Sequence, residues 1–171
     1  KIKYRGSAKN IFKNYVNSVV FLYNPTKGKE SLGAGFLVDK SGIILTNWHV
    51  TNGTKEIYVW PLPEGGSVET EVLFKEIDPH FGAVLAENKT QDLALIKVNS
   101  LPSSARLVEL GSNSEIENGD TVYAIGQPNG LPWNFTNGMV TQIRKDKKWV
   151  YDDKSEHTAT VIQTQTPISP G

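Results

Sequence analysis

Short apolar runs, each of strand length and each ended by a turn signal, constrain the fold of this chain more than any other feature. Gly, Pro, Asn and Asp gather in the turns between them. The runs are residues 18–23, 34–39, 42–46, 56–60, 70–77, 92–98, 121–125, 139–144 and 158–163. Many short strands of this kind predict an all-β barrel or sandwich. Apolar residues at helical spacing in 10–16 add one short N-terminal helix.

Composition excludes several classes of protein. The 171 residues suffice for one sizeable domain or two small barrels. The 18 Lys and Arg balance the 18 Asp and Glu, which argues against a nucleic-acid partner because phosphate binding needs a basic surface. No apolar run approaches the roughly 20 residues of a membrane-spanning helix, so no membrane span is expected.

The residues suggest no cofactor and no metal. With no cysteine, the chain has no disulfide, no thiolate metal site and no Cys nucleophile within these residues. His80 and His157 lack metal-ligand spacing with another histidine, and both are interpreted as surface residues.

Residues 99–104 carry no strand pattern and contain a proline, which marks them as a linker. They divide the chain into two predicted units. Residues 1–99 would hold the N-terminal helix and a first barrel with His49 and Asp92. Residues 100–171 would hold the linker and a partial second barrel.

His49 and Asp92 are the two residues best placed for chemistry. His49 follows the apolar run 43–45 at the end of a predicted strand, where a side chain can be exposed. Asp92 opens the apolar strand 93–98, so its carboxylate would be partly shielded from water. Peptide hydrolysis by a serine needs a base beside the hydroxyl and a carboxylate behind that base. The two residues are far apart in the sequence, so they can meet only through the tertiary fold.

Several motifs occur around these two residues in a fixed order. They are GAGFLV at 33–38, GIILTNWHV at 42–50, DLALIKV at 92–98, VYAIGQPNG at 122–130, GMV at 138–140 and IQTQTPISPG at 162–171. This set resembles the protease domain of the bacterial HtrA/Deg-type trypsin-like serine peptidases, from about residue 18 to the last residue. The resemblance implies a two-barrel chymotrypsin-like fold, with the second barrel incomplete in this chain. It also implies an active site between the barrels, with His49 as general base and Asp92 as its orienting partner.

The resemblance further implies roles for the last residues. The nucleophilic Ser is expected two positions beyond Gly171, so the 171-residue chain alone is expected to be nearly inert. Gly171 would supply one backbone N–H of the oxyanion hole. Thr166, Pro167 and Ile168 would line one wall of the primary specificity pocket. Because that wall has no Asp, we expect a small or medium apolar residue before the cut.

Protein or peptide substrates, a location outside the cytoplasm (periplasmic or secreted) and assembly into homo-oligomers also follow from the resemblance. Two alternatives stay open at this point: an inactive peptide-binding module with the same fold, and a chymotrypsin-like protease with a Cys nucleophile. Segments 60–66, 79–83 and 132–135 depart from the family pattern and are interpreted as surface insertions.

Overall fold

The computed structural model describes residues 7–151 and 154–167. The chain begins with helix α1 (Ala8–Tyr15), where the Ser7 hydroxyl caps the first turn by accepting a hydrogen bond from the Asn10 N–H. The single-turn helix η1 (Val16–Ser18) then leads into the first strand. The structure therefore confirms the predicted N-terminal helix.

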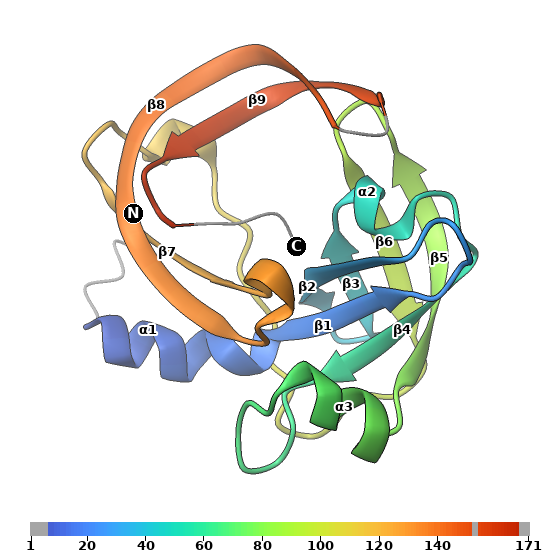
Figure 1. Cartoon of the computed structure of the whole chain (residues 1–171). Helices are drawn as coiled ribbons and strands as arrows, with labels where there is room; N and C mark the ends of the chain where they lie inside the picture. Colours follow the sequence, from blue (N-terminus) through green and yellow to red (C-terminus); the bar gives the residue numbers. More distant parts are fainter. Residues whose placement is uncertain (1–6, 152–153, 168–171) are drawn as a thin grey trace.

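Six antiparallel strands form a closed barrel, seen on the right of Figure 1. Around the barrel they are β1 (Val19–Asn24), β2 (Ser31–Asp39), β3 (Ile43–Thr46), β6 (Leu93–Val98), β5 (His80–Asn88) and β4 (Glu56–Pro61). Inward-facing aliphatic side chains such as Leu22, Ile44 and Ile96 fill the interior. The alternation of buried and exposed positions in β6 is what a strand with one face on a core requires.

The turn between β2 and β3 depends on glycine. Gly42 has a φ of +91°, and a Cβ at this position would lie 2.3 Å from the Val98 carbonyl oxygen. Only glycine avoids that clash and adopts this backbone conformation readily. Gly42 thus lets the β2–β3 turn close against the end of β6.

Two predicted elements of the first barrel were wrong. Residues 70–76 form helix α3 (Thr70–Glu76) instead of a strand: Leu73 is buried and Lys75 pairs with Glu71 one turn away. Residues 79–83 belong largely to β5, a barrel strand rather than an insertion. The strand was hard to recognise because Phe81 and Leu85 are exposed apolar residues, so β5 lacks a polar outer face.

Three strands form a second sheet in the order β7 (Thr121–Gly126), β8 (Asn134–Val150) and β9 (Glu156–Thr164). The single turns η2 (Asn113–Glu115) and η3 (Pro128–Gly130) flank β7. β8 is much longer than predicted, and it curves along the left and top of the view in Figure 1 with β9 beside it. The far end of this hairpin reaches the barrel, where the Thr158 N–H donates to the Thr90 carbonyl.

A tryptophan from the second sheet's loop packs into the first barrel's outer cluster. Trp133 is buried among Val16, Val19, Phe21, Trp60 and Leu73, and its indole N–H donates to the Val19 carbonyl at 2.9 Å. Segment 132–135 is therefore not a surface insertion at this residue. The Ser67 hydroxyl and the Thr70 hydroxyl donate to the Pro132 and Gly130 carbonyls, which ties the α3 segment to the same loop.

The barrel and the second sheet agree with a mostly β fold. The division of the chain at residues 99 and 100 stays a prediction. Trp133 and the residues just after the linker bind the first barrel. The Arg106 N–H and the Val108 N–H donate to the Asn17 and Leu37 carbonyls.

Replacement of Trp133 by Ala should lower the free energy of unfolding by about 3–5 kcal/mol, since it empties a buried site and removes the indole hydrogen bond. Leu131→Ala is the matched control in the same loop: Leu131 is 53% exposed, so its loss should cost at most about 0.5 kcal/mol. Urea unfolding followed by fluorescence and circular dichroism measures both. Equal effects of the two substitutions would contradict the anchoring role of Trp133.

Candidate active site

A single helical turn presents His49. Helix α2 (Trp48–Thr51) follows β3 directly, and its end is fixed by neighbouring strands. The Ser31 hydroxyl donates to the Val50 carbonyl at 2.7 Å, and the Asn24 amide donates to the Thr51 carbonyl at 2.8 Å. Gly33 lets Val50 approach, because a Cβ there would lie 2.5 Å from a Val50 methyl. Hydrogen bonds from side chains to backbone carbonyls, together with close packing, therefore hold the turn that carries His49.

Asp92 stands at the entrance of β6 and is 1% exposed. Its φ of +56° lies in the left-handed region, which Asp tolerates better than most residues. The Asp92 N–H donates to the Lys89 carbonyl and closes the β5–β6 turn. A left-handed residue at the start of a buried strand is the kind of local strain that accumulates at functional sites.

The two residues singled out in the sequence meet in the structure. His49 Nδ1 lies 2.9 Å from Asp92 Oδ2, and the His49 backbone N–H donates to Asp92 Oδ1, also at 2.9 Å. The carboxylate thus binds both the ring and the backbone of the same residue. The His49 side chain remains 29% exposed, whereas that of Asp92 is 2% exposed. The buried Asp92 carboxylate therefore orients the imidazole through Nδ1, while part of the ring stays exposed to solvent.

Two further side chains donate to the same carboxylate. The Asn47 amide lies 3.2 Å from Asp92 Oδ2 and 3.0 Å from the Asp92 carbonyl oxygen. The Tyr151 hydroxyl donates to Asp92 Oδ2 at 3.1 Å, and the Tyr151 ring packs on the His49 ring with centroids 4.6 Å apart. Asn47 comes from the β3–α2 junction, and Tyr151 follows the end of β8.

Burial and hydrogen bonding act in opposite directions on Asp92. Burial of the carboxyl favours its neutral form, but the hydrogen bonds and charge of His49, with that of Tyr151, outweigh burial and lower the pKa of Asp92. The pKa of Tyr151 is raised by burial first, and then by the charge of Asp92 and the hydrogen bond to it. Asp92 is therefore ionised and Tyr151 neutral at pH 7.

His157 was wrongly interpreted as a surface residue. It is 1% exposed, and its Nδ1 lies 2.6 Å from the Lys89 carbonyl while its Nε2 lies 2.8 Å from the Ser155 hydroxyl. Its ring contacts the rings of Trp48, Trp149 and Tyr151. His80, by contrast, is partly exposed on β5. His157 is thus one of the residues through which the β8–β9 hairpin docks beside the His49–Asp92 pair.

The remaining predicted site residues are less defined. Thr166 is 8% exposed, and its backbone packs against Gly138, where a Cβ would lie 2.5 Å from the Thr166 nitrogen. Pro167 is exposed. Ile168 and Gly171 lie outside the described residues, so their predicted roles in the pocket and the oxyanion hole stay predictions.

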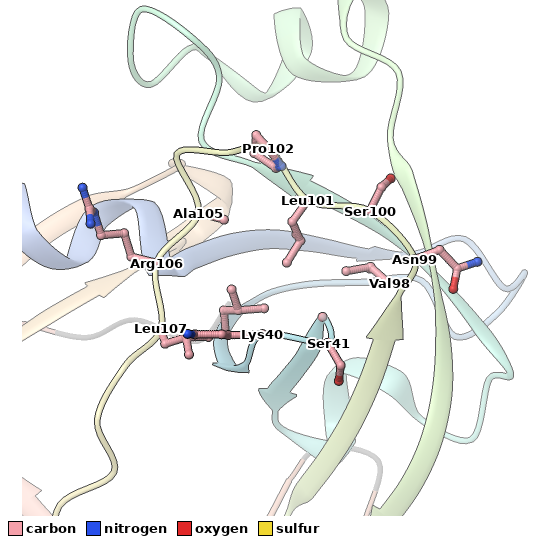
Figure 2. Close-up of a pocket in the computed structure, with 12 residues that line it drawn as sticks. Lys40, Ser41, Val98, Asn99, Ser100, Leu101, Pro102, Ala105, Arg106 and Leu107 are labelled. Atoms are coloured by element: carbon pink, nitrogen blue, oxygen red, sulfur yellow. The ribbon is translucent and has the colours of Figure 1, made fainter.

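A pocket of about 510 Å³ lies away from the His49–Asp92 pair, between the β2–β3 turn and the linker. Figure 2 shows Leu101 and Val98 lining it, with the Arg106 side chain extending away from Leu101. Neither His49 nor Asp92 lines this pocket. Among residues 7–151 and 154–167, no three His, Asp or Glu side chains gather as a metal site.

Tyr151 and Asn47 are the site residues that sequence reasoning missed. Asn47 stands beside His49 in a quoted motif, but only the fold reveals that its amide reaches Asp92. Tyr151 lies 59 positions beyond Asp92, at the hairpin end that follows the largely basic residues 144–148. The aromatic residues Trp149 and Tyr151 at that end were the available signal, since exposed hairpin ends are usually polar.

Comparisons with known proteins show the family and the fold of the chain. The family model of the trypsin-like peptidase domain matches residues 33–171. A probable periplasmic serine endoprotease DegP-like of Halomonas elongata is 34% identical over 146 residues, which are 84% of this chain and 26% of that protein. The crystal structure of Deg5 superposes with a TM-score of 0.70 at 24% identity, over 95% of this chain and 74% of that one.

A further solved structure, the HtrA-type protease AlgW with a decapeptide, has a TM-score of 0.70 at 21% identity, over 97% of this chain and 53% of that one. The chain belongs to the trypsin-like peptidase domain family, among the HtrA/DegP-type serine proteases. It has the trypsin-like fold and is homologous to serine endoproteases of that type. It spans between 26% and 35% of the length of three curated relatives. No helix in the described ranges is long and apolar enough to cross a membrane.

Asp92 should stabilise the fold in a pH-dependent way. Its pKa is lower in the native protein than in the unfolded chain, where it is about 3.9. The contribution is therefore fully present above about pH 4 and is lost as the pH falls through the lower native pKa. Asp92→Asn should lower the free energy of unfolding at pH 7 by about 1–3 kcal/mol, and this difference should shrink in acid.

Urea unfolding of the wild-type protein and of the Asp92→Asn variant, from pH 7 down to pH 2, measures this difference in the free energy of unfolding. The control is Asp78→Asn, which changes an exposed carboxylate between α3 and β5. A difference for Asp92→Asn that grows as the pH falls would contradict the assigned hydrogen bonds.

Proposed function

We propose that this chain is the His- and Asp-bearing part of a serine endopeptidase that hydrolyses peptide bonds in proteins. His49 is the general base and Asp92 is the carboxylate that orients it. The nucleophile is a Ser two positions beyond Gly171, and the Gly171 N–H is one donor of the oxyanion hole. Two observations support the proposal: the Nδ1–Oδ2 distance of 2.9 Å and the homology to serine endoproteases.

In the proposed mechanism, each atom of the His49–Asp92 pair has one role. Asp92 Oδ2 accepts a hydrogen bond from the Nδ1–H of His49, which leaves the ring's free lone pair on Nε2. Nε2 takes the proton of the serine hydroxyl as that oxygen attacks the scissile carbonyl carbon. The resulting imidazolium is stabilised by the Asp92 carboxylate and then gives its proton to the leaving amine. A water molecule then attacks the acyl-enzyme, His49 takes its proton and passes it to the serine oxygen, and the acyl group leaves as a carboxylic acid.

The hydrogen bond from the His49 backbone to Asp92 Oδ1 supports the assignment beyond the ring contact alone. A surface ion pair would leave both partners free to rotate, and its geometry would contribute little. Here the carboxylate holds the main chain and the ring of His49 together. These two contacts keep the His49 ring in one rotamer, so the general base has the same orientation in every catalytic cycle.

The proposed substrates are exposed or unfolded segments of proteins. The relative AlgW is described with bound peptides, which supports a peptide substrate here. The DegP-like relative is named periplasmic, which supports a location outside the cytoplasm. Assembly into homo-oligomers is part of the same proposal, and size-exclusion chromatography with light scattering tests it.

Loss of either residue of the pair should abolish hydrolysis. In a polypeptide that extends past Gly171, His49→Ala and Asp92→Asn should each lower kcat by roughly 10⁴-fold, since each removes a triad member. Hydrolysis of a fluorescent casein measures this. The control is His80→Ala. His80 is a histidine on β5 whose ring contacts the Ser100 hydroxyl, so its loss should leave kcat unchanged.

Labelling with a fluorophosphonate, followed by peptide mapping, separates the proposal from its alternatives. One adduct per polypeptide, on a serine two positions past Gly171, supports the serine endopeptidase. A longer polypeptide that stays unlabelled and hydrolyses no casein, with His49 or with Ala at that position, favours the inactive binding module. Labelling of a cysteine at that position by iodoacetamide favours the Cys protease.

The residues proposed to line the specificity pocket predict the residue before the cut. The wall formed by Thr166, Pro167 and Ile168 carries no acidic side chain, so small or medium apolar residues should be preferred there. Mass-spectrometric sequencing of cleaved peptide libraries reads this preference directly. A preference for Lys or Arg before the cut would refute it.

A further inference from the structure

The Asp92 carboxylate is held by donors from both halves of the fold. Asn47 and His49 come from the β3–α2 junction of the barrel, while the Tyr151 hydroxyl comes from the β8–β9 hairpin. Three side-chain donors thus share one oxygen, Oδ2. Trypsin-like catalysis uses such a carboxylate to fix a tautomer, so any donor that controls its position also controls the base.

The hairpin end is anchored on the barrel at several points, so the position of Tyr151 is determined by more than its own hydroxyl. Buried His157 bonds the Lys89 carbonyl, and the Thr158 N–H donates to the Thr90 carbonyl. The Tyr151 N–H donates to the Ser155 carbonyl across the hairpin end. The Tyr151 ring then lies between the rings of His49 and His157, with centroids 4.6 and 5.1 Å away.

We propose that Tyr151 is a positioning residue: its hydroxyl fixes the Asp92 carboxylate, and its ring restrains the His49 imidazole from the side. This inference rests on the proposed function. Through this side chain the β8–β9 hairpin takes part in the catalytic arrangement of the barrel. Docking of the hairpin, through His157, completes the pair; withdrawal of the hairpin leaves Asp92 with donors from the barrel alone.

The physical effect is orientation rather than proton transfer. A buried carboxylate with three side-chain donors and one backbone donor has few alternative rotamers. Removing the Tyr151 hydroxyl frees part of Oδ2, so Asp92 can turn and the His49 ring with it. Because the Tyr151 hydroxyl binds the buried Asp92 carboxylate, substrate binding should be little affected, and kcat should carry the change.

Tyr151→Phe is the sharpest variant, since it keeps the ring and removes the hydroxyl alone. In a polypeptide that extends past Gly171, we expect kcat to fall roughly 3- to 30-fold with KM nearly unchanged. In an Asp92→Asn background the same change should have little further effect, because Tyr151 acts through that carboxylate. Tyr58→Phe is the matched control: it removes a phenol hydroxyl from β4, where the ring contacts are other aromatic residues.

A titration that needs no catalysis separates this inference from the proposed function. Carbon-13 NMR of the labelled Asp92 carboxyl should show its pKa rising in Tyr151→Phe and staying constant in Tyr58→Phe. Phenol absorbance should show the pKa of Tyr151 falling in Asp92→Asn. An unchanged Asp92 titration, or a kcat that rises in Tyr151→Phe, would overturn the positioning role. Full hydrolysis by His49→Ala would instead overturn the proposed function, whatever the titration shows.

Discussion

A buried carboxylate needs partners, and the arrangement of this molecule around Asp92 follows from that need. The side chain is 2% exposed, and an unpaired charge at such a position would cost several kcal/mol. The Asn47 amide, the His49 ring and backbone, and the Tyr151 hydroxyl supply the donors. The left-handed backbone of Asp92 turns its carboxylate toward them. The ionised Asp92 carboxylate therefore binds donors from the barrel, from helix α2 and from the long β8–β9 hairpin.

The second sheet binds the barrel at two separated places. The β8–β9 end docks beside α2 through His157, whereas Trp133, in the β7–β8 loop, packs in the cluster that holds Val19 and Phe21 of β1. The first contact is polar and aromatic, and the second is largely apolar. Because the contacts differ in chemistry, conditions that weaken one need not weaken the other. The hairpin end is held mostly by hydrogen bonds, which a modest rearrangement can exchange for water.

The sequence predicted those parts of the molecule in which local pattern and family motif coincide. These parts are the β-rich architecture, the N-terminal helix and the His49–Asp92 pair. The apolar run 43–45 before His49 and the apolar strand after Asp92 can each be recognised in a short segment of the sequence. Residues 70–77 misled because their β-branched and aromatic content resembles a strand, while the contacts that make them helical lie on β1 and β4. Tyr151, His157 and Trp133 act across long sequence separations, which no local pattern records.

Trp133 lies 114 residues after Val19, whose carbonyl it binds, and so joins the outer cluster of the first barrel late in synthesis. When β6 has left the ribosome, the barrel strands can pair, yet Phe21, Trp60 and Leu73 still lack their largest partner. A nascent chain would therefore display an aromatic, partly uncovered face until the β7–β8 loop emerges. At a synthesis rate of about 5–20 residues per second, that interval lasts seconds, long enough for a chaperone to bind. The loop that stabilises the finished fold thus also determines when its first half becomes safe from aggregation.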